Sequence, residues 1–228
     1  VYKGSRMSAS RSYLRPVRDR KNLDVTTLAA IDAHTGMGLA AEAMLLVQSD
    51  GGGGLEAAQA EVEALGRFAQ AHGALDVAVS DDPDDSAALI AMRRMAQPSF
   101  ERWAQAHGGG QLLDDVCLPR TRLPEFYDRL ETIRQESGLM IAVVAHAGDG
   151  NTHPLIVFDP ADVDEAERAQ VAFGQIMDLA IELGGTITGE HGVGRLKAPW
   201  LPAQLGDDVF PRLLRQLGRD GFQIAFDQ

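Results

Sequence analysis

Two apolar runs separated by an Asp-Gly pair constrain the fold of this chain more than any other feature. Residues 140–145 read MIAVVA and residues 154–158 read PLIVF, and the segment HAGDGNTH stands between them at 146–153. Both central positions of a tight two-residue hairpin turn require positive φ, and Asp-Gly is a preferred pair for that geometry. The sequence therefore predicts an antiparallel hairpin that turns at Asp149-Gly150.

A turn at that pair sets His146 directly opposite His153. Opposed residues project from the same face of a sheet, with Cβ atoms about 4.5–5.5 Å apart. Two imidazoles so placed can both reach one metal ion. A bulge at either glycine of the turn would shift this register, and two histidines stacked at a sheet edge without a ligand are the structural alternative.

The segments around the hairpin alternate between strand and helix patterns. One further helix is expected to begin near Ser86, which would be its N-cap. The order indicates an α+β domain with an antiparallel or mixed sheet and helices on one face. Strand patterns cover residues 43–49, 76–80, 112–118, 140–146 and 152–158, and helix patterns cover residues 55–72, 124–137 and 162–183.

Composition excludes several classes of protein. The formal net charge of −12 argues against a nucleic-acid partner, because phosphate binding needs clustered positive charge. No stretch reaches the roughly 18 uncharged apolar residues of a membrane span. The single cysteine, Cys117, excludes an intrachain disulfide, and no apolar signal segment follows Val1, so we expect a cytoplasmic protein.

Charge is unevenly distributed along the chain. Residues 1–27 hold seven Lys or Arg against two Asp, whereas the remaining residues carry 14 positive and 31 negative side chains. A basic arm for an anionic partner is one interpretation. The stretch Ser8–Thr27, however, resembles a short internal piece of the glucose-methanol-choline family of flavoenzymes. We therefore expect residues 1–27 to be a fusion scar or a disordered arm, and residues 28–228 to form the functional domain.

The second motif lies after the long helix, where residues 184–195 read GGTITGEHGVGR. Its glycines give a loop whose backbone can approach a ligand closely. In an extended segment, the adjacent Glu190 and His191 would project in different directions. Glu190 could then complete a site of two histidines and one carboxylate, while His191 acts as a base toward the substrate. A solvated Glu-His pair in a turn is the alternative.

Together, the motifs at 146–153 and 184–197 (GGTITGEHGVGRLK) resemble the C-terminal domain of the FAD-linked oxidases. This family includes the glycolate oxidase flavin subunit, D-lactate dehydrogenase and D-2-hydroxyglutarate dehydrogenase. The resemblance runs from about Leu28 to about Asp208 and implies a ferredoxin-like cap domain of a vanillyl-alcohol-oxidase-type flavoprotein.

The resemblance also implies roles for individual residues. His146, His153 and Glu190 would bind a divalent metal, with zinc, manganese and iron all compatible with these ligands. His191 would be the catalytic base. Asn151 is expected near the flavin or the substrate.

An arginine that binds the substrate carboxylate is implied on the helix that reads LIAMRRM. Arg93 fits this role best and Arg94 is the second choice, with a solvated helix residue as the alternative. The substrate implied is a small 2-hydroxy acid, such as glycolate, D-lactate or D-2-hydroxyglutarate, whose C2 hydride passes to FAD.

The family's flavin-binding domain precedes the region that this chain resembles. We therefore expect most of the FAD site to lie outside the chain, and a separate FAD-binding polypeptide or an electron-acceptor subunit to be its partner. A catalytically inert fragment is the first alternative. A metal hydrolase that uses His191 as the base to a bound water is the second.

Overall fold

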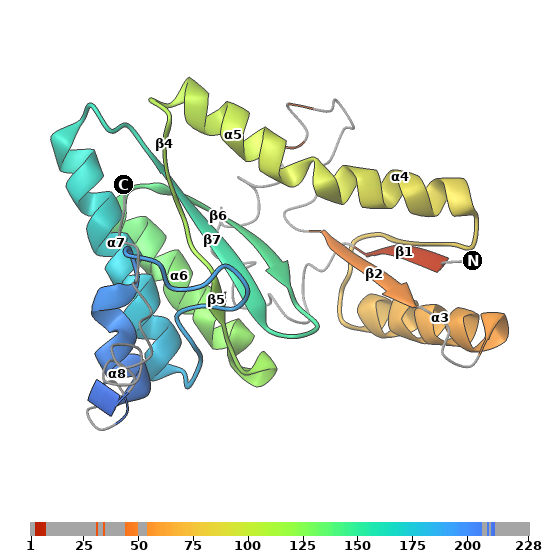
Figure 1. The fold of residues 1–228 in the computed structure, drawn as a ribbon. Coiled ribbons are helices and arrows are strands. Elements are labelled where there is room, and N and C mark those ends of the chain that lie inside the picture. The colour runs from red at the N-terminus through yellow and green to blue at the C-terminus, as the bar shows by residue number, and fades with distance from the viewer. Residues whose placement is uncertain are drawn as a thin grey trace, which may run out of the picture.

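The computed structural model describes residues 3–7, 31, 34, 44–49, 54–206, 209, 211 and 212. Within these residues, the chain forms two antiparallel sheets with helices packed beside them (Figure 1). The predicted α+β class with an antiparallel sheet is confirmed.

The first sheet has the strand order β2-β1-β3 and is antiparallel throughout. Strand β1 (Lys3–Met7) lies between β2 (Leu45–Ser49) and β3 (Val77–Ser80), and helix α3 (Leu55–Ala71) follows β2. Five of the residues expected to form a fusion scar or a disordered arm thus lie in a strand of this sheet. The boundary at residue 27 stays a prediction, because residues 8–27 lie outside the described residues.

Two helices, α4 (Pro83–Arg94) and α5 (Ala96–Ala106), connect the two sheets. Helix α4 begins before the predicted cap at Ser86. The side chain of Asp82 accepts the backbone N–H of Asp84 at 2.7 Å, so Asp82 fills the capping role that was predicted for Ser86.

The second sheet is built around β7 (Asn151–Phe158). Strand β6 (Met140–His146) pairs along one edge of β7, while β4 (Gly110–Leu113) and β5 (Val116–Cys117) pair with successive parts of the other edge. The single strand predicted at 112–118 is thus interrupted at Asp114-Asp115. One cause is Pro154, which accepts the N–H of Asp114 at 2.8 Å but has no N–H to return.

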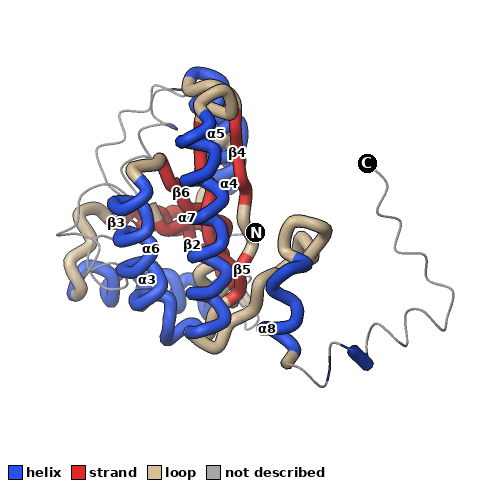
Figure 2. Tube along the Cα trace, turned by 90° about the vertical axis from the view of Figure 1, so that its left-hand side faces the viewer, coloured by secondary structure: helices blue, strands red, loops and turns tan. Residues whose placement is uncertain are grey.

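Helices cover both faces of this sheet. Helices α6 (Leu123–Ser137) and α7 (Val163–Glu182) run side by side on one face, and α5 covers part of the other (Figures 1 and 2). Successive side chains of a strand point to opposite faces of the sheet, so alternate residues pack into two separate hydrophobic cores, one on each face. The core against α6 and α7 contains Phe126, Leu130, Phe173, Ile176 and Met177 with Ile141 and Ile156, and the core against α5 contains Phe100 and Ala104 with Ala142, Leu155 and Val157.

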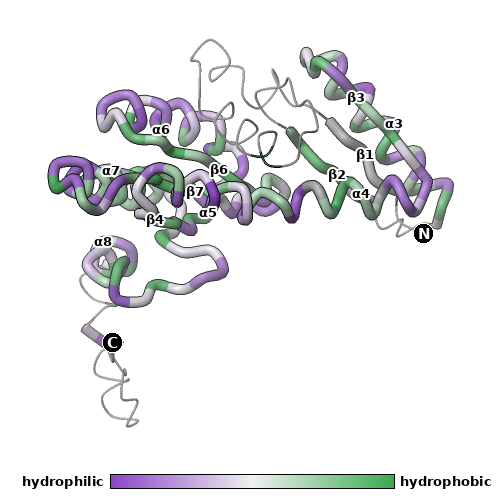
Figure 3. Tube along the Cα trace, turned by 90° about the horizontal axis from the view of Figure 1, so that it is seen from above, coloured by the Kyte–Doolittle hydropathy of each residue, from purple (hydrophilic) through white to green (hydrophobic). Residues whose placement is uncertain are grey.

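Helix α7 is amphipathic, and Figure 3 shows polar and apolar residues alternating along it. It is capped by Asp162, whose side chain accepts the N–H of Glu165 at 3.0 Å. A short 3-10 helix at Ala198–Trp200 leads into α8 (Leu201–Leu205), and Trp200 Nε1 donates to Asp178 of α7 at 2.9 Å. Over the described part of the chain, no helix is both long and apolar enough to span a bilayer.

Candidate metal and substrate site

The hairpin forms where the sequence predicts it, but with a longer turn. His146 pairs with Asn151, and Val144 pairs with His153. Residues 147–150 therefore make a four-residue turn, in which Asp149 Oδ1 accepts the N–H of Asn151 at 2.9 Å and Gly150 has a φ of 90°. The predicted pairing of His146 with His153 is wrong by two residues.

The two histidines nevertheless project from the same face of the sheet. A slip of one residue would turn a side chain to the other face, whereas a slip of two residues preserves the face. Val144, directly opposite His153, is two residues from His146. The rings of the two histidines meet edge to face, with centroids 5.5 Å apart. They lie on the α5 side of the sheet, because Val144 packs into that core.

The loop after α7 brings Glu190 and His191 to this face. Gly184, with a φ of 74°, closes the helix. Thr186 then exchanges two backbone hydrogen bonds with Cys117, at 3.1 and 2.8 Å, so the loop enters the sheet beside β5. From that point, the chain bends at residues 187 and 189–191.

Three imidazoles converge on one oxygen of Glu190. Its Oε1 lies 3.3 Å from His153 Nε2, and 3.6 Å from the Nε2 atoms of both His146 and His191. Because the loop is bent and not extended, the expected divergence of Glu190 and His191 is wrong. The ligand atoms of His146, His153 and Glu190 all lie within 4.8 Å of one another, as do those of a second group formed by Asp115, His153 and His191.

The environment of His153 suits a metal ligand. Burial lowers its pKa; the neighbouring His191 and His146 act in the same direction, while Asp115 and Glu190 oppose them. The neutral form, which is favoured at neutral pH, has the lone pair that binds a metal. Two imidazoles and one carboxylate are donors that fit a divalent ion.

Sequence reasoning missed Asp115. This residue is buried, and its carboxylate accepts hydrogen bonds from the loop at 188–191. Burial, the largest single influence, raises its pKa, but the hydrogen bonds from His191, Thr188 and Gly189 and the charge of Lys197 together hold the pKa below its usual value. The available signal was a pair of acidic residues inside an apolar strand pattern.

The other two predicted residues also lie at this site. Arg93 Nη2 is 3.3 Å from His146 Nδ1, and Arg94 is exposed at the same helix end. Asn151 is buried, and its Oδ1 has no hydrogen-bond partner among the residues that the structure describes. It lies against Gly189, where a Cβ would overlap the Asn151 amide. The structure therefore gathers all six predicted site residues, while their individual roles stay predictions.

Comparison with known proteins shows which family the chain belongs to. The model of the FAD linked oxidases, C-terminal domain, matches residues 16–217. The chain belongs to this family. The matched region includes residues 16–27, which we had expected, from the resemblance of Ser8–Thr27 to another family, to belong to a separate segment.

Several curated relatives are similar to this FAD-linked oxidase domain. Glycolate oxidase subunit GlcD of Bacillus subtilis is 35% identical over 80% of the chain and 38% of the relative. Its Escherichia coli K12 counterpart is 36% identical over 77% of the chain and 34% of the relative. The mitochondrial D-lactate dehydrogenase [cytochrome] of Arabidopsis thaliana is 30% identical over 85% of the chain and 33% of the relative. The chain thus spans about a third of the length of these relatives.

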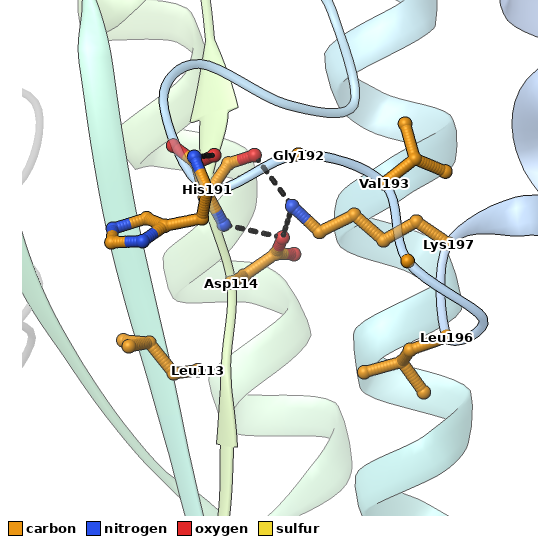
Figure 4. A pocket seen from close by; sticks show the side chains of 9 residues that line it. Leu113, Asp114, His191, Gly192, Val193, Leu196 and Lys197 are labelled. Atoms are coloured by element: carbon orange, nitrogen blue, oxygen red, sulfur yellow. Dashed lines mark hydrogen bonds and ion pairs between the residues drawn. The ribbon is translucent and has the colours of Figure 1, made fainter. Parts of the chain in front are cut away.

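A buried lysine, also missed from sequence, supports the loop of this FAD-linked oxidase domain. Lys197 Nζ donates to the backbone carbonyl of Asp115 at 2.8 Å and lies 3.3 Å from Asp114 Oδ1. Burial raises the pKa of Asp114 to about 6, although Lys197 acts to lower it. These residues line a pocket of about 260 Å³ beside His191, whose imidazole points away from Lys197 and Asp114 (Figure 4).

Proposed function

We propose that this domain binds a small 2-hydroxy acid and a divalent metal ion for an FAD-dependent dehydrogenase of the glycolate, D-lactate or D-2-hydroxyglutarate type. The convergence of three imidazoles on one oxygen of Glu190 carries the proposal. Relatives named for glycolate oxidase and D-lactate dehydrogenase support the substrate class. Because the chain spans about a third of those relatives, the complete reaction is proposed for this domain together with a flavin-binding part or partner.

His146, His153 and Glu190 would hold the metal ion. Their two nitrogens and one oxygen suit zinc, manganese or iron and leave coordination positions for a substrate. A divalent ion held there would supply Lewis acidity that lowers the pKa of the substrate hydroxyl.

His191 is the proposed base. Its side chain is 56% exposed, so a substrate can reach the imidazole, and its Nε2 lies 3.6 Å from Glu190 Oε1. When Nε2 takes the hydroxyl proton, the nearby carboxylate stabilises the imidazolium that forms. A base positioned in this way contributes roughly 10²–10⁴ in rate.

Arg93 and Asn151 would orient the substrate. The guanidinium of Arg93, beside His146, can bind a carboxylate through two parallel hydrogen bonds. The buried Asn151 Oδ1 has no hydrogen-bond partner among the described residues, which supports a place for Asn151 near the substrate or the flavin. In the overall reaction, His191 would take the hydroxyl proton, and FAD, when bound, would supply the acceptor for the C2 hydride. The two transfers together would account for the oxidation of the hydroxy acid to a 2-keto acid.

Elemental analysis of the purified chain after equilibration with zinc, manganese or iron tests the site. We expect one bound ion for the unmodified chain, and loss of that ion in His153→Ala. His191→Ala should keep the ion and lose turnover in an enzyme reconstituted with a flavin-binding partner. The exposed His107, whose Nδ1 lies 2.8 Å from the backbone carbonyl of Trp103, provides the control His107→Ala, which should keep both the ion and the turnover.

Two results would reject the metal proposal: an unmodified chain that binds no ion, or a His153→Ala chain that binds as much as the control. A separate titration of the metal-loaded chain with glycolate and D-lactate, followed by calorimetry, tests the substrate class. Metal binding without binding of either acid would favour the catalytically inert fragment.

A further inference from the structure

We propose that Asp115 is the positioning residue that holds His153 and the loop bearing Glu190 and His191 in one arrangement, an inference that rests on the proposed metal site. Asp115 is far from this loop in sequence and stands at the interruption between β4 and β5. This one carboxylate would thus position β7 and the loop at 188–191, which together with β6 are the three segments that supply the proposed metal ligands.

The first contact is with the loop. Asp115 Oδ2 accepts four hydrogen bonds from four consecutive residues. Charge-assisted hydrogen bonds of this kind are about twice as strong as neutral ones. Because three of the donors are backbone N–H groups, they fix the path of the main chain and so the direction in which its side chains leave it. The donors are the Thr188 hydroxyl at 2.9 Å and the N–H groups of Gly189 at 2.9 Å, Glu190 at 3.0 Å and His191 at 2.8 Å.

The second contact is with His153. Leu113 pairs with Leu155, and Val116 pairs with Thr152, so the same register sets Asp115 opposite His153. The N–H of Asp114 bonds to Pro154, which makes the neighbouring Asp115 position a non-hydrogen-bonded pair, whose side chains lie closer together. Asp115 Oδ1 is accordingly 3.7 Å from His153 Nδ1.

The position of Asp115 gives the two ring nitrogens of His153 different surroundings. Its Nδ1 is buried and has no hydrogen-bond partner among the described residues, while its Nε2 faces Glu190 at 3.3 Å. A carboxylate behind Nδ1 favours the proton on that atom and leaves the lone pair of Nε2 directed into the site. Carboxylate–histidine pairs of this kind set the tautomer and ring orientation of metal ligands.

Asp115 could instead be a ligand, since it also forms a group with His153 and His191. Its hydrogen bonds argue against this. A metal ion at Oδ2 would compete for that oxygen with four donors of the loop, three of which are backbone N–H groups. Oδ1 is directed at His153. The arrangement therefore favours orientation over ligation.

Co²⁺ binding to the full chain tests the inference, with Asp115→Asn as the variant and Asp114→Asn as the matched control. Both residues are buried in the same interruption, but Asp114 contacts Lys197 and not the loop amides. We expect Asp115→Asn to weaken Co²⁺ binding by about 10–100-fold, the usual effect of losing such a partner. Its visible Co²⁺ spectrum should change, and amide exchange at residues 189–191 should accelerate in the metal-free protein. The control should retain the affinity, the spectrum and slow exchange at these residues.

A milder variant covers the case in which Asp115→Asn does not fold. Thr188→Val removes one of the four donors and keeps the carboxylate, so it should produce a smaller loss of affinity and a smaller gain in exchange. If Asp115→Asn, or failing that Thr188→Val, matches the control in affinity, spectrum and exchange, Asp115 has no positioning role and the metal site stands. If the unmodified chain binds no Co²⁺, the metal site fails, and amide exchange alone decides whether Asp115 anchors the loop.

Discussion

Replacing Gly150 by alanine should destabilise the protein strongly, because two separate penalties coincide at this turn residue. Its φ is 90°, and a Cβ there would overlap the carbonyl oxygen of Leu118. Leu118 is buried and donates its own N–H to the Gly150 carbonyl at 3.0 Å. Moving either backbone segment away would therefore break this hydrogen bond or disturb the packing of Leu118. A left-handed backbone costs about 1–2 kcal/mol and overpacking about 1–3 kcal/mol, which gives a loss of about 2–5 kcal/mol.

Thermal melts with two control variants separate these penalties. Gly138 has a φ of 66° with nothing within 4 Å of an added Cβ, so Gly138→Ala reports the backbone penalty alone. Gly148, in the same turn as Gly150, has neither a positive φ nor a nearby atom, so Gly148→Ala should be close to neutral. At about 2–4 °C per kcal/mol for a chain this size, Gly150→Ala should melt about 4–20 °C below the unmodified protein. A midpoint no lower than that of Gly138→Ala would refute the steric argument.

Two further predictions concern stability. Deleting residues 1–7 should lower the melting midpoint, because the first sheet would lose the strand that joins β2 to β3; an unchanged midpoint would show that β1 contributes nothing. The second concerns Asp114, whose pKa is raised from 3.8 to about 6, so that the folded state binds its proton more tightly than the unfolded state. At 1.36 kcal/mol per pKa unit, this shift corresponds to about 3 kcal/mol of folding stability. That stability is fully present below about pH 4 and is lost as the pH rises through about 6. Urea unfolding across this range should show that loss in the unmodified protein and not in Asp114→Asn, and parallel curves would contradict it.

Local patterns predicted most of the second sheet and its helices. Strand β6 has the predicted bounds, β7 begins one residue early, and α7 begins directly after Asp162. These segments have strong periodicity, clear turn residues and a capping side chain, all of which are encoded by near neighbours in the sequence. The interruption at Asp114-Asp115 was not predicted, because it depends on Pro154 of a strand that follows nearly forty residues later.

The site shows the same division between local and distant information. The predicted two-residue turn at Asp149-Gly150 was wrong. The turn spans four residues, and the side chain of Asp149 accepts a hydrogen bond from the N–H of Asn151 there. The prediction that His146 and His153 project from one face of the sheet was still right, because a shift of two residues in strand register keeps a side chain on the same face. Asp115 and Lys197 act through contacts more than 70 residues apart in sequence, and no periodicity marks such pairs.

The charges around the site are balanced in a way that favours a divalent ion and an anionic substrate. Loop donors surround Asp115, and Lys197 lies beside Asp114, which leaves Glu190 as the carboxylate that faces the three imidazoles. Two neutral imidazoles and one carboxylate around a divalent ion give a complex with a net charge of about +1. In the proposed complex, that charge and the guanidinium of Arg93 beside it would attract a monocarboxylate. A second ionised carboxylate among the ligands would cancel this attraction, so the proposed use of the site requires Asp115 to stay with the loop and not the metal.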